Sequence, residues 1–322
     1  MVASVKSGLA GARGAVIICF AACLLLMSWF APGMFTPRNV GNLFSNLLPL
    51  LVLTTGEMLV LIGGGIDLSV TSIMAVASVL GAKMMNGGNG WLAGSPWAAP
   101  SAVVAMLLAC AALGALNGLA VTRLEMPPFI VSLTTMMLFS GAAVWATKSR
   151  NIDRLPAAFC RIGGAPYPLL IAAALVLSTH ALLRRSVWGR WLYAVGMNAR
   201  TSLVSGVPVQ AITVAAYAAS GSFAAVAAVL YTARLETGSP VLGQRVFLDV
   251  IAAAVIGGAS LSGGRGGIPG ILGGVLFVAA LDNALNLVGF SFSVVLMAKG
   301  AVILAAAALD TARSRAWGAA RT

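Results

Sequence analysis

The sequence predicts an all-α, polytopic integral membrane protein with about ten transmembrane helices, some of them broken, in one bundle. Of its 322 residues, 60% are hydrophobic and only 9% are charged, whereas roughly 25% are charged in an ordinary soluble domain. Two uncharged stretches, 15–31 and 126–147, are each long enough to cross a bilayer, because about 20 apolar residues span its hydrocarbon core. These observations together indicate a membrane protein of many spans.

The apolar segments give the expected spans in chain order. They lie at about 15–31, 43–62, 67–86, 99–121, 129–147, 167–183, 210–231, 248–260, 268–288 and 291–309. The first follows Lys6 and Arg13 as a signal peptide would, but it is long and lacks an A-x-A cleavage site, so we expect a retained span. With the N-terminus inside, eleven of the 20 Lys and Arg residues lie inside and seven outside, which favours cytoplasmic N- and C-termini.

We expect a single transmembrane domain, with the cytoplasmic parts being the N-terminus (1–14), one loop (184–209) and the C-terminal tail (311–322). The loop carries four arginines and is too polar for a span, so short helices against a partner or the membrane surface would suit it. Residues 198–205 are long enough for about two helical turns, which Gly206 and Pro208 would end. The net charge of +12 is scattered over such loops, which indicates topology-setting cations and no nucleic-acid partner.

Glycines mark the expected helix contacts and breaks. Gly114-x-x-x-Gly118, Gly266-x-x-x-Gly270 and Gly270-x-x-x-Gly274 place small residues on one helical face, which lets helix backbones approach closely. The stretch IGGGIDLSV (62–70) also resembles IGGASLSGG (256–264). Such an internal echo is typical of transporters built from repeats, although a nine-residue match also arises by chance.

The motifs that are missing argue against an enzyme. No G-x-x-x-x-G-K-[ST] nucleotide-binding loop occurs in the sequence. LSGG (261–264) resembles the signature of ABC ATPases, but it lies between two expected spans, so we interpret it as a tight turn. With one histidine, His180, and no C-x-x-C pair among the four cysteines, we expect no catalytic residue and no metal site.

Ionisable groups within the apolar runs are the candidate functional residues, since a charge there costs ~2.5–3.5 kcal/mol on insertion scales. These are Glu57, Asp67, Asp282 and Lys299. Asp67 follows three glycines, and the simpler interpretation is that it caps the next helix. In the alternative, the glycines unwind the helix and Asp67 lines a substrate route. The two roles are compatible.

Near the C-terminus, the polar residues Asp282, Asn283 and Asn286 lie within little more than one helical turn. They suit a hydroxyl-rich ligand and interhelical hydrogen bonding equally well. The residues expected at the transport pathway or at a helix break are therefore Glu57, Gly63, Gly64, Gly65, Asp67, Ser69, Asn283 and Asn286.

Four ordered motifs carry a family resemblance. They read IGGGIDLSVTSIMA, NGLAVTRLEMPPFIVSLTTM, GRWLYAVGMNARTSLVSGVPV and DVIAAAVIGGASLSGGRGGIPGILGG followed by LDNALNLVGFS. From about residue 36 to 310, the chain resembles the membrane permease of ribose-type ABC sugar importers. The resemblance implies translocation of a monosaccharide or small polyol across a bacterial inner membrane.

The resemblance also implies partners. A periplasmic sugar-binding protein would deliver the sugar, a separate cytoplasmic ABC ATPase would hold ATP and Mg, and the permease would pair with a second copy or a different permease. This chain would then hold no cofactor. The family's ATPase-coupling segment corresponds to 189–207, and its expected contact residues are Gly189, Arg190, Asn198, Ala199, Arg200, Thr201, Ser202, Ser205 and Gly206.

The coupling segment departs from the family pattern. Relatives usually show G-G-N-E-x-A-A where this chain reads GMNARTS (196–202), so the acidic residue is absent and Arg200 stands nearby. The departure bears on the strength of coupling and on partner choice. The alternative function is an ion-coupled secondary transporter that uses Glu57 and Asp67 as a proton or sodium relay and needs no ATPase. A scaffold or receptor without transport is a third possibility.

Overall fold

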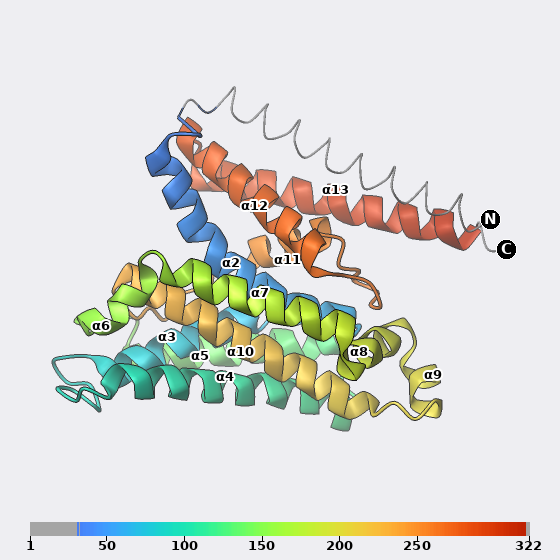
Figure 1. The fold of residues 1–322 in the computed structure, drawn as a ribbon, viewed down its shortest axis with the longest axis horizontal. Helices are drawn as coiled ribbons and strands as arrows, with labels where there is room; N and C mark the ends of the chain where they lie inside the picture. The colour runs from blue at the N-terminus through green and yellow to red at the C-terminus, as the bar shows by residue number, and fades with distance from the viewer. Residues whose placement is uncertain (1–30, 32, 320–322) are drawn as a thin grey trace.

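The computed structural model describes residue 31 and residues 33–319, and the regular elements of this part of the chain are all helices, with no strand (Figure 1). Its elements are α2 (Pro37–Ile62), α3 (Val70–Met85), α4 (Ala98–Arg123), α5 (Pro128–Thr147), α6 (Ala157–Cys160), the 3-10 turn η1 (Arg161–Gly163), α7 (Tyr167–Arg185), α8 (Val187–Met197), α9 (Ala199–Val204), α10 (Val209–Leu235), α11 (Phe247–Ile256), α12 (Ile268–Val288) and α13 (Phe292–Ala319). The expected N-terminus (1–14) and, apart from Ala31, the expected first span lie outside the described residues.

The predicted all-α membrane fold is confirmed. Each apolar segment expected from residue 43 onward overlaps a helix, and six helices are long and apolar enough to cross a membrane: α2, α4, α5, α7, α10 and α12. The shorter apolar helices are α3, α11 and the Phe292–Val302 part of α13. Since α3 follows an interruption and α11 precedes one, the expected broken helices are present. The expected tail is partly helical, because α13 continues to Ala319.

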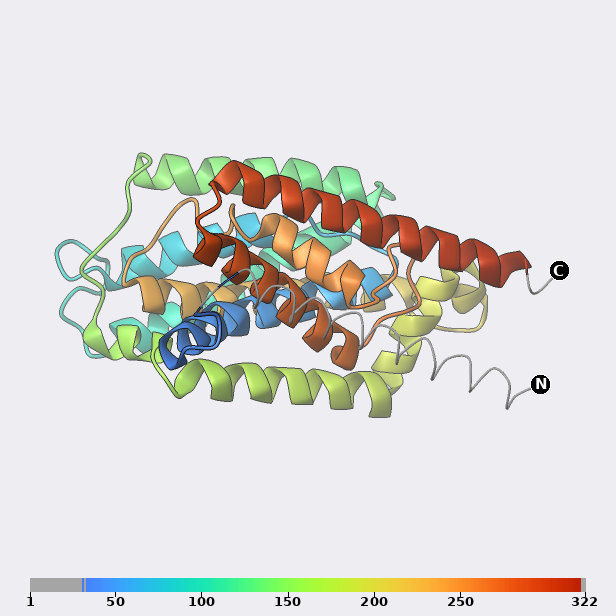
Figure 2. The ribbon, with the colours of Figure 1, turned by 90° about the horizontal axis from the view of Figure 1, so that it is seen from above.

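Helix α2 is the centre of the bundle. In its most apolar window 89% of the residues are buried, compared with 22% in α5 and 28% in α7. Figure 2 shows α5 and α7 on opposite flanks with α2 between them. The break that follows α2 is buried at Gly65 and from Asp67 to Ser69, whereas Gly64 is exposed. Its buried backbone polar groups need partners.

The expected glycine faces are confirmed as helix contacts. On α4, a Cβ added to Gly114 would lie 2.2 Å from the Tyr217 carbonyl oxygen of α10. On α12, a Cβ added to Gly270 would lie 1.9 Å from the Gly257 oxygen, at the end of α11. A larger residue has no room at either place, so glycine sets how closely these helices approach. Gly266 lies instead in the turn before α12.

The connecting segments gather at two opposite ends of the bundle. At one end, the Asn86 side-chain amide donates to the Asp153 carbonyl oxygen, and Ile152 pairs with Gly238 across a single β-bridge. At the other end lie α8, α9, the connection between α11 and α12, and the C-terminal end of α13 (Figure 1, right). This grouping matches the alternation of sides that the sequence predicts.

Candidate transport and coupling site

The first break, residues 63–69, answers why an apolar chain carries three consecutive glycines. After Ile62, the N–H groups of Gly63, Gly64 and Gly65 donate to the carbonyl oxygens of Leu59, Leu61 and Val60 at 3.2, 3.0 and 3.0 Å. Gly64 has φ +83°, in the left-handed region that favours glycine. The glycines thus satisfy the last carbonyls of α2 and turn the chain away from the helix axis.

The second break, residues 257–267, repeats this cap. After Ile256, the N–H groups of Gly257, Gly258 and Ala259 donate to Ala253, Val255 and Ala254, each at 2.9 Å. The sequence offsets of the three bonds are the same as in the first break, and Gly258 also has φ +83°. The internal echo in the sequence therefore corresponds to one backbone structure that is used twice.

The LSGG segment forms the tight turn that the sequence predicts. Gly263 and Gly264 have φ +83° and +70°, and the Ser260 N–H donates to the Arg265 carbonyl oxygen at 3.0 Å. This turn reaches across to the first break, where the Gly264 N–H donates to the Ile62 carbonyl oxygen at 2.9 Å. The two breaks are thus joined directly, backbone to backbone.

Helix α8 packs onto the point where the breaks meet. A Cβ added to Gly196 would lie 1.8 Å from the Ile62 oxygen and 2.6 Å from the Gly264 nitrogen, and one added to Gly263 would lie 2.5 Å from the Gly196 oxygen. We call Ile62, Gly64, Gly196, Gly263 and Gly264 the glycine junction. Here three segments far apart in the sequence are in contact through their backbones.

Two side chains of α8 support the junction. Leu192 is fully buried, and its side chain lies against Gly63. The Tyr193 hydroxyl donates to the Gly266 carbonyl oxygen at 2.9 Å. Burial raises the pKa of Tyr193 above its ordinary value, so the hydroxyl keeps its proton at neutral pH and can donate this bond.

The expected coupling residues lie on α8 and α9, next to the junction. The short helix predicted within 198–205 is α9, and the Asn198 side chain caps it by accepting from the Thr201 N–H at 2.9 Å. Gly206, at φ +82°, follows its end. Gly189 is buried against the end of α7 and Ser202 is also buried. The exposed members of the set are Arg190, Asn198, Ala199, Arg200, Thr201, Ser205 and Gly206.

A buried carboxylate cluster holds the start of α3. Asp67 Oδ1 accepts from the Ser69 N–H at 3.0 Å and from the Ser69 hydroxyl at 2.6 Å. Glu57 Oε1 accepts from the Asp67 N–H at 3.2 Å, and the Asn117 amide donates to the Ser69 hydroxyl at 2.7 Å. All four side chains are buried. The N-cap of α3 is Ser69, whose own side chain makes no capping bond. Asp67 therefore supports the start of α3 by holding Ser69 and is not itself the cap, while its place on a substrate route stays a prediction.

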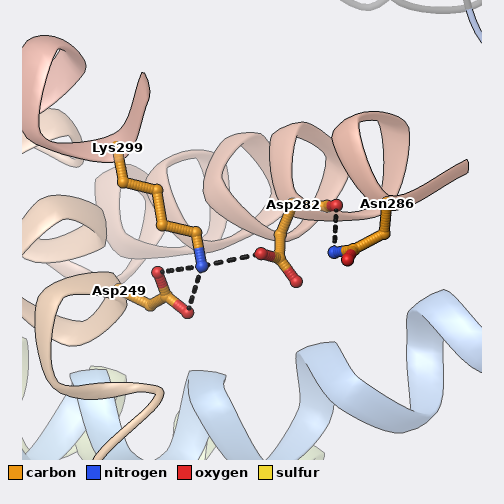
Figure 3. A network of polar contacts seen from close by, with 4 residues as sticks. All are labelled: Asp249, Asp282, Asn286 and Lys299. Carbon is orange, nitrogen blue, oxygen red and sulfur yellow. Dashed lines mark hydrogen bonds and ion pairs between the residues drawn. The ribbon is translucent and has the colours of Figure 1, made fainter. Parts of the chain in front are cut away.

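The polar residues near the C-terminus connect helices (Figure 3). Lys299 Nζ of α13 lies 2.9 Å from Asp249 Oδ1 of α11 and 2.7 Å from Asp282 Oδ1 of α12. Asn283 exchanges two side-chain hydrogen bonds, of 2.8 and 3.0 Å, with Asn39 of α2. Asn286 donates to the Asp282 carbonyl oxygen of its own helix. Of the two roles expected for Asn283, ligand binding and interhelical hydrogen bonding, the structure therefore contains the second.

The sequence interpretation missed three residues of these networks: Asn39, Asn117 and Asp249. Asn117 and Asp249 lie inside expected spans, and an isolated polar group in an apolar run is a usable signal. Asn39 lies before the expected second span, so no such signal marked it.

Comparisons with known proteins agree with this architecture. Residues 39–307 match a family model described as the permease component of the branched-chain amino acid transport system. The chain is 36% identical to ribose import permease protein RbsC of Bacillus subtilis, with 90% of each chain covered, and 32% identical to that of Escherichia coli, covering 91% and 92%. It is also 28% identical to xylose transport system permease protein XylH of Escherichia coli, covering 93% and 92%.

No solved structure matches. The relatives are named as permease components of import systems, which argues against the ion-coupled carrier considered as the alternative. A family model that spans most of the chain, together with relatives aligned over nine-tenths of it, identifies the chain as a multi-pass membrane protein that belongs to this family of transport-system permease components.

Proposed function

We propose that the chain is the membrane permease subunit of an ABC importer that carries a monosaccharide or a similar small polyol across a bacterial inner membrane. The names of its relatives, for ribose and for xylose, support this substrate class. The observation that carries the mechanism is the glycine junction, because it places α8 in contact with both helix breaks. A movement of α8 would therefore act directly on both interrupted helices.

The partners follow from this role. A periplasmic binding protein delivers the sugar, and a separate cytoplasmic ABC ATPase binds ATP and Mg and supplies the free energy. The permease pairs with a second permease, either the same chain or a different one. We infer that the end of the bundle that carries α8, α9 and the end of α13 faces the cytoplasm. The distribution of Lys and Arg supports this orientation and cytoplasmic termini.

The surface of α9 suits an ATPase groove. Met197, Leu203 and Val204 expose 77%, 62% and 85% of their surface around this short helix. Apolar side chains presented by a helix are a common way to dock in a groove, and the neighbouring Arg200 gives the surface a positive charge. A movement of α9 is transmitted through Asn198 to α8, where Gly196 leaves no gap to Ile62 and Gly264.

Cross-linking in the assembled transporter tests this docking. We expect Thr201→Cys, on exposed α9, to cross-link to the ATPase in a nucleotide-dependent way, whereas Asn89→Cys, exposed at the opposite end, does not. Arg200→Glu should change ATPase stimulation while the permease stays folded, because it reverses a charge on the docking surface. Cross-links that form only from Asn89→Cys would contradict both the docking and the orientation.

A further inference from the structure

A hollow of about 340 Å³ lies between α3, α5 and the segment that leads into α11. Its polar lining comes from Thr71, Ser72, Ser140 and Gln244, and its apolar lining includes Met136 and Phe247. None of the residues expected at the transport pathway lines it. The volume is at the lower end of the range for small-molecule sites, which is about 300–1,000 Å³.

The polar groups of the hollow are free to bind a ligand. Thr71 is only 5% exposed, yet its hydroxyl makes no hydrogen bond within the described part of the chain, and the same holds for the side chains of Ser140 and Gln244. Ser72 donates to the Ser69 carbonyl oxygen, which leaves its oxygen able to accept. These groups are therefore open to a ligand or to water that enters the hollow.

Among the hydroxyl side chains of α5, only the one that lines the hollow makes no hydrogen bond within the described part of the chain. Its other hydroxyl residues, Ser132, Thr134, Thr135 and Thr147, all donate to carbonyl oxygens of the same helix. Ser140 is the exception among the hydroxyl side chains of α5, and it is the one that lines the hollow.

The hollow also lies next to both interrupted helices. Thr71 and Ser72 belong to the first turn of α3, directly after the first break, and Phe247 is the first residue of α11, which ends at the second. The segment before α11 is pressed onto α3, because a Cβ on Gly243 would lie 2.7 Å from the Thr71 carbonyl oxygen. A rearrangement at the breaks would therefore reshape the walls of the hollow.

We propose that this hollow is a transit subsite for the sugar, in which Thr71, Ser140 and Gln244 hydrogen-bond sugar hydroxyls and Phe247 contacts the apolar face of the ring. The proposal rests on the proposed function and names the residues that would carry it. Two hydroxyls and one amide that make no hydrogen bond within the described part of the chain, beside an aromatic side chain, suit a small polyol better than a purely apolar solute.

The test uses the complete transporter in proteoliposomes, with ribose and xylose as probes. Thr71→Val, Ser140→Ala and Gln244→Leu each remove hydrogen-bonding groups and keep most of the volume. We expect each to lower sugar uptake about 3- to 10-fold at an unchanged amount of assembled complex, as the loss of one or two hydrogen bonds predicts. The matched control is Thr134→Val, because the Thr134 hydroxyl bonds only to its own helix.

A second readout does not depend on the uptake rate. With the native cysteines replaced, a cysteine at Ser140 should react more slowly with a small maleimide when sugar-loaded binding protein and ATP are present, whereas a cysteine at Thr134 should not. If wild type imports sugar but all three variants behave like Thr134→Val and no protection occurs, the subsite is overturned and the function stands. If wild type imports neither sugar, the function and the subsite fall together.

Discussion

The two helix breaks share a backbone cap but are supported differently. Both end a helix with the same three hydrogen bonds and a left-handed glycine. The first spans seven residues, 63–69, and is held by the buried carboxylates of Glu57 and Asp67. The second spans eleven, 257–267, and its segment reaches across to Ile62 and to α8 instead.

This difference shows that one feature ends the helix at each break and another fixes the flanking helices in place. The glycine cap ends the helix in both places, so it does not require a charge. The carboxylates at the first break fix where α3 begins, inside the most buried part of the bundle. At the second break the flanking helices are held further away, by the Lys299 ion contacts with Asp249 and Asp282 (Figure 3). Substitutions at the two breaks should therefore have different effects.

The largest effect is expected at the support of the second break. Lys299→Met leaves the buried Asp249 carboxylate uncompensated, and removing one partner of a buried ion pair costs about 3–5 kcal/mol. Thermal unfolding of the purified transporter should show this loss. The matched control is Lys83→Met, since no ion pair of Lys83 occurs among the described residues. Adding Asp249→Asn to Lys299→Met should restore part of the stability, and a Lys299→Met variant as stable as the control would contradict this support.

A smaller effect is expected at the first break. Asp67→Leu removes the acceptor of the Ser69 N–H and hydroxyl and should lower the free energy of unfolding by about 1–3 kcal/mol. Asp67→Asn keeps one oxygen acceptor and should lose less. The comparison needs unfolding and sugar uptake for both variants. Equal and severe loss of uptake in both, with normal folding, would assign the charge itself to transport and contradict a purely structural role of Asp67.

The sequence predicted where helices begin and end better than it predicted which side chains contact one another. The glycine run after Ile62 and the apolar segments locate the first break and the expected spans, because helix caps and span lengths depend on local chemistry. The sequence predicts the second only as a turn after the span 248–260, whereas α11 already ends at Ile256. The length of α9 was also close, and it is shorter than 198–205 because Asn198 serves as its cap outside the helix.

The contacts between distant segments could not be predicted. Asn283 pairs with Asn39 over 244 positions, and Ser69 with Asn117 over 48. The local sequence pattern of one helix does not indicate which other helix provides the hydrogen-bond partner of its polar side chain. Gly196 is the clearest case, since a glycine in a short amphipathic helix carries no sign that its backbone contacts Ile62 and Gly264.

Hydrogen exchange in the assembled transporter tests the glycine junction most directly. In Gly196→Ala the added Cβ has no room against Ile62 and Gly264, and forcing extra volume into a packed contact costs roughly 1–3 kcal/mol. We expect amides in both 62–68 and 257–266 to exchange faster together, by about tenfold or more. Gly273→Ala, where a Cβ meets nothing within 4 Å, should change neither segment. Faster exchange in only one of the two breaks, or in neither, would contradict the account that α8 holds both breaks together.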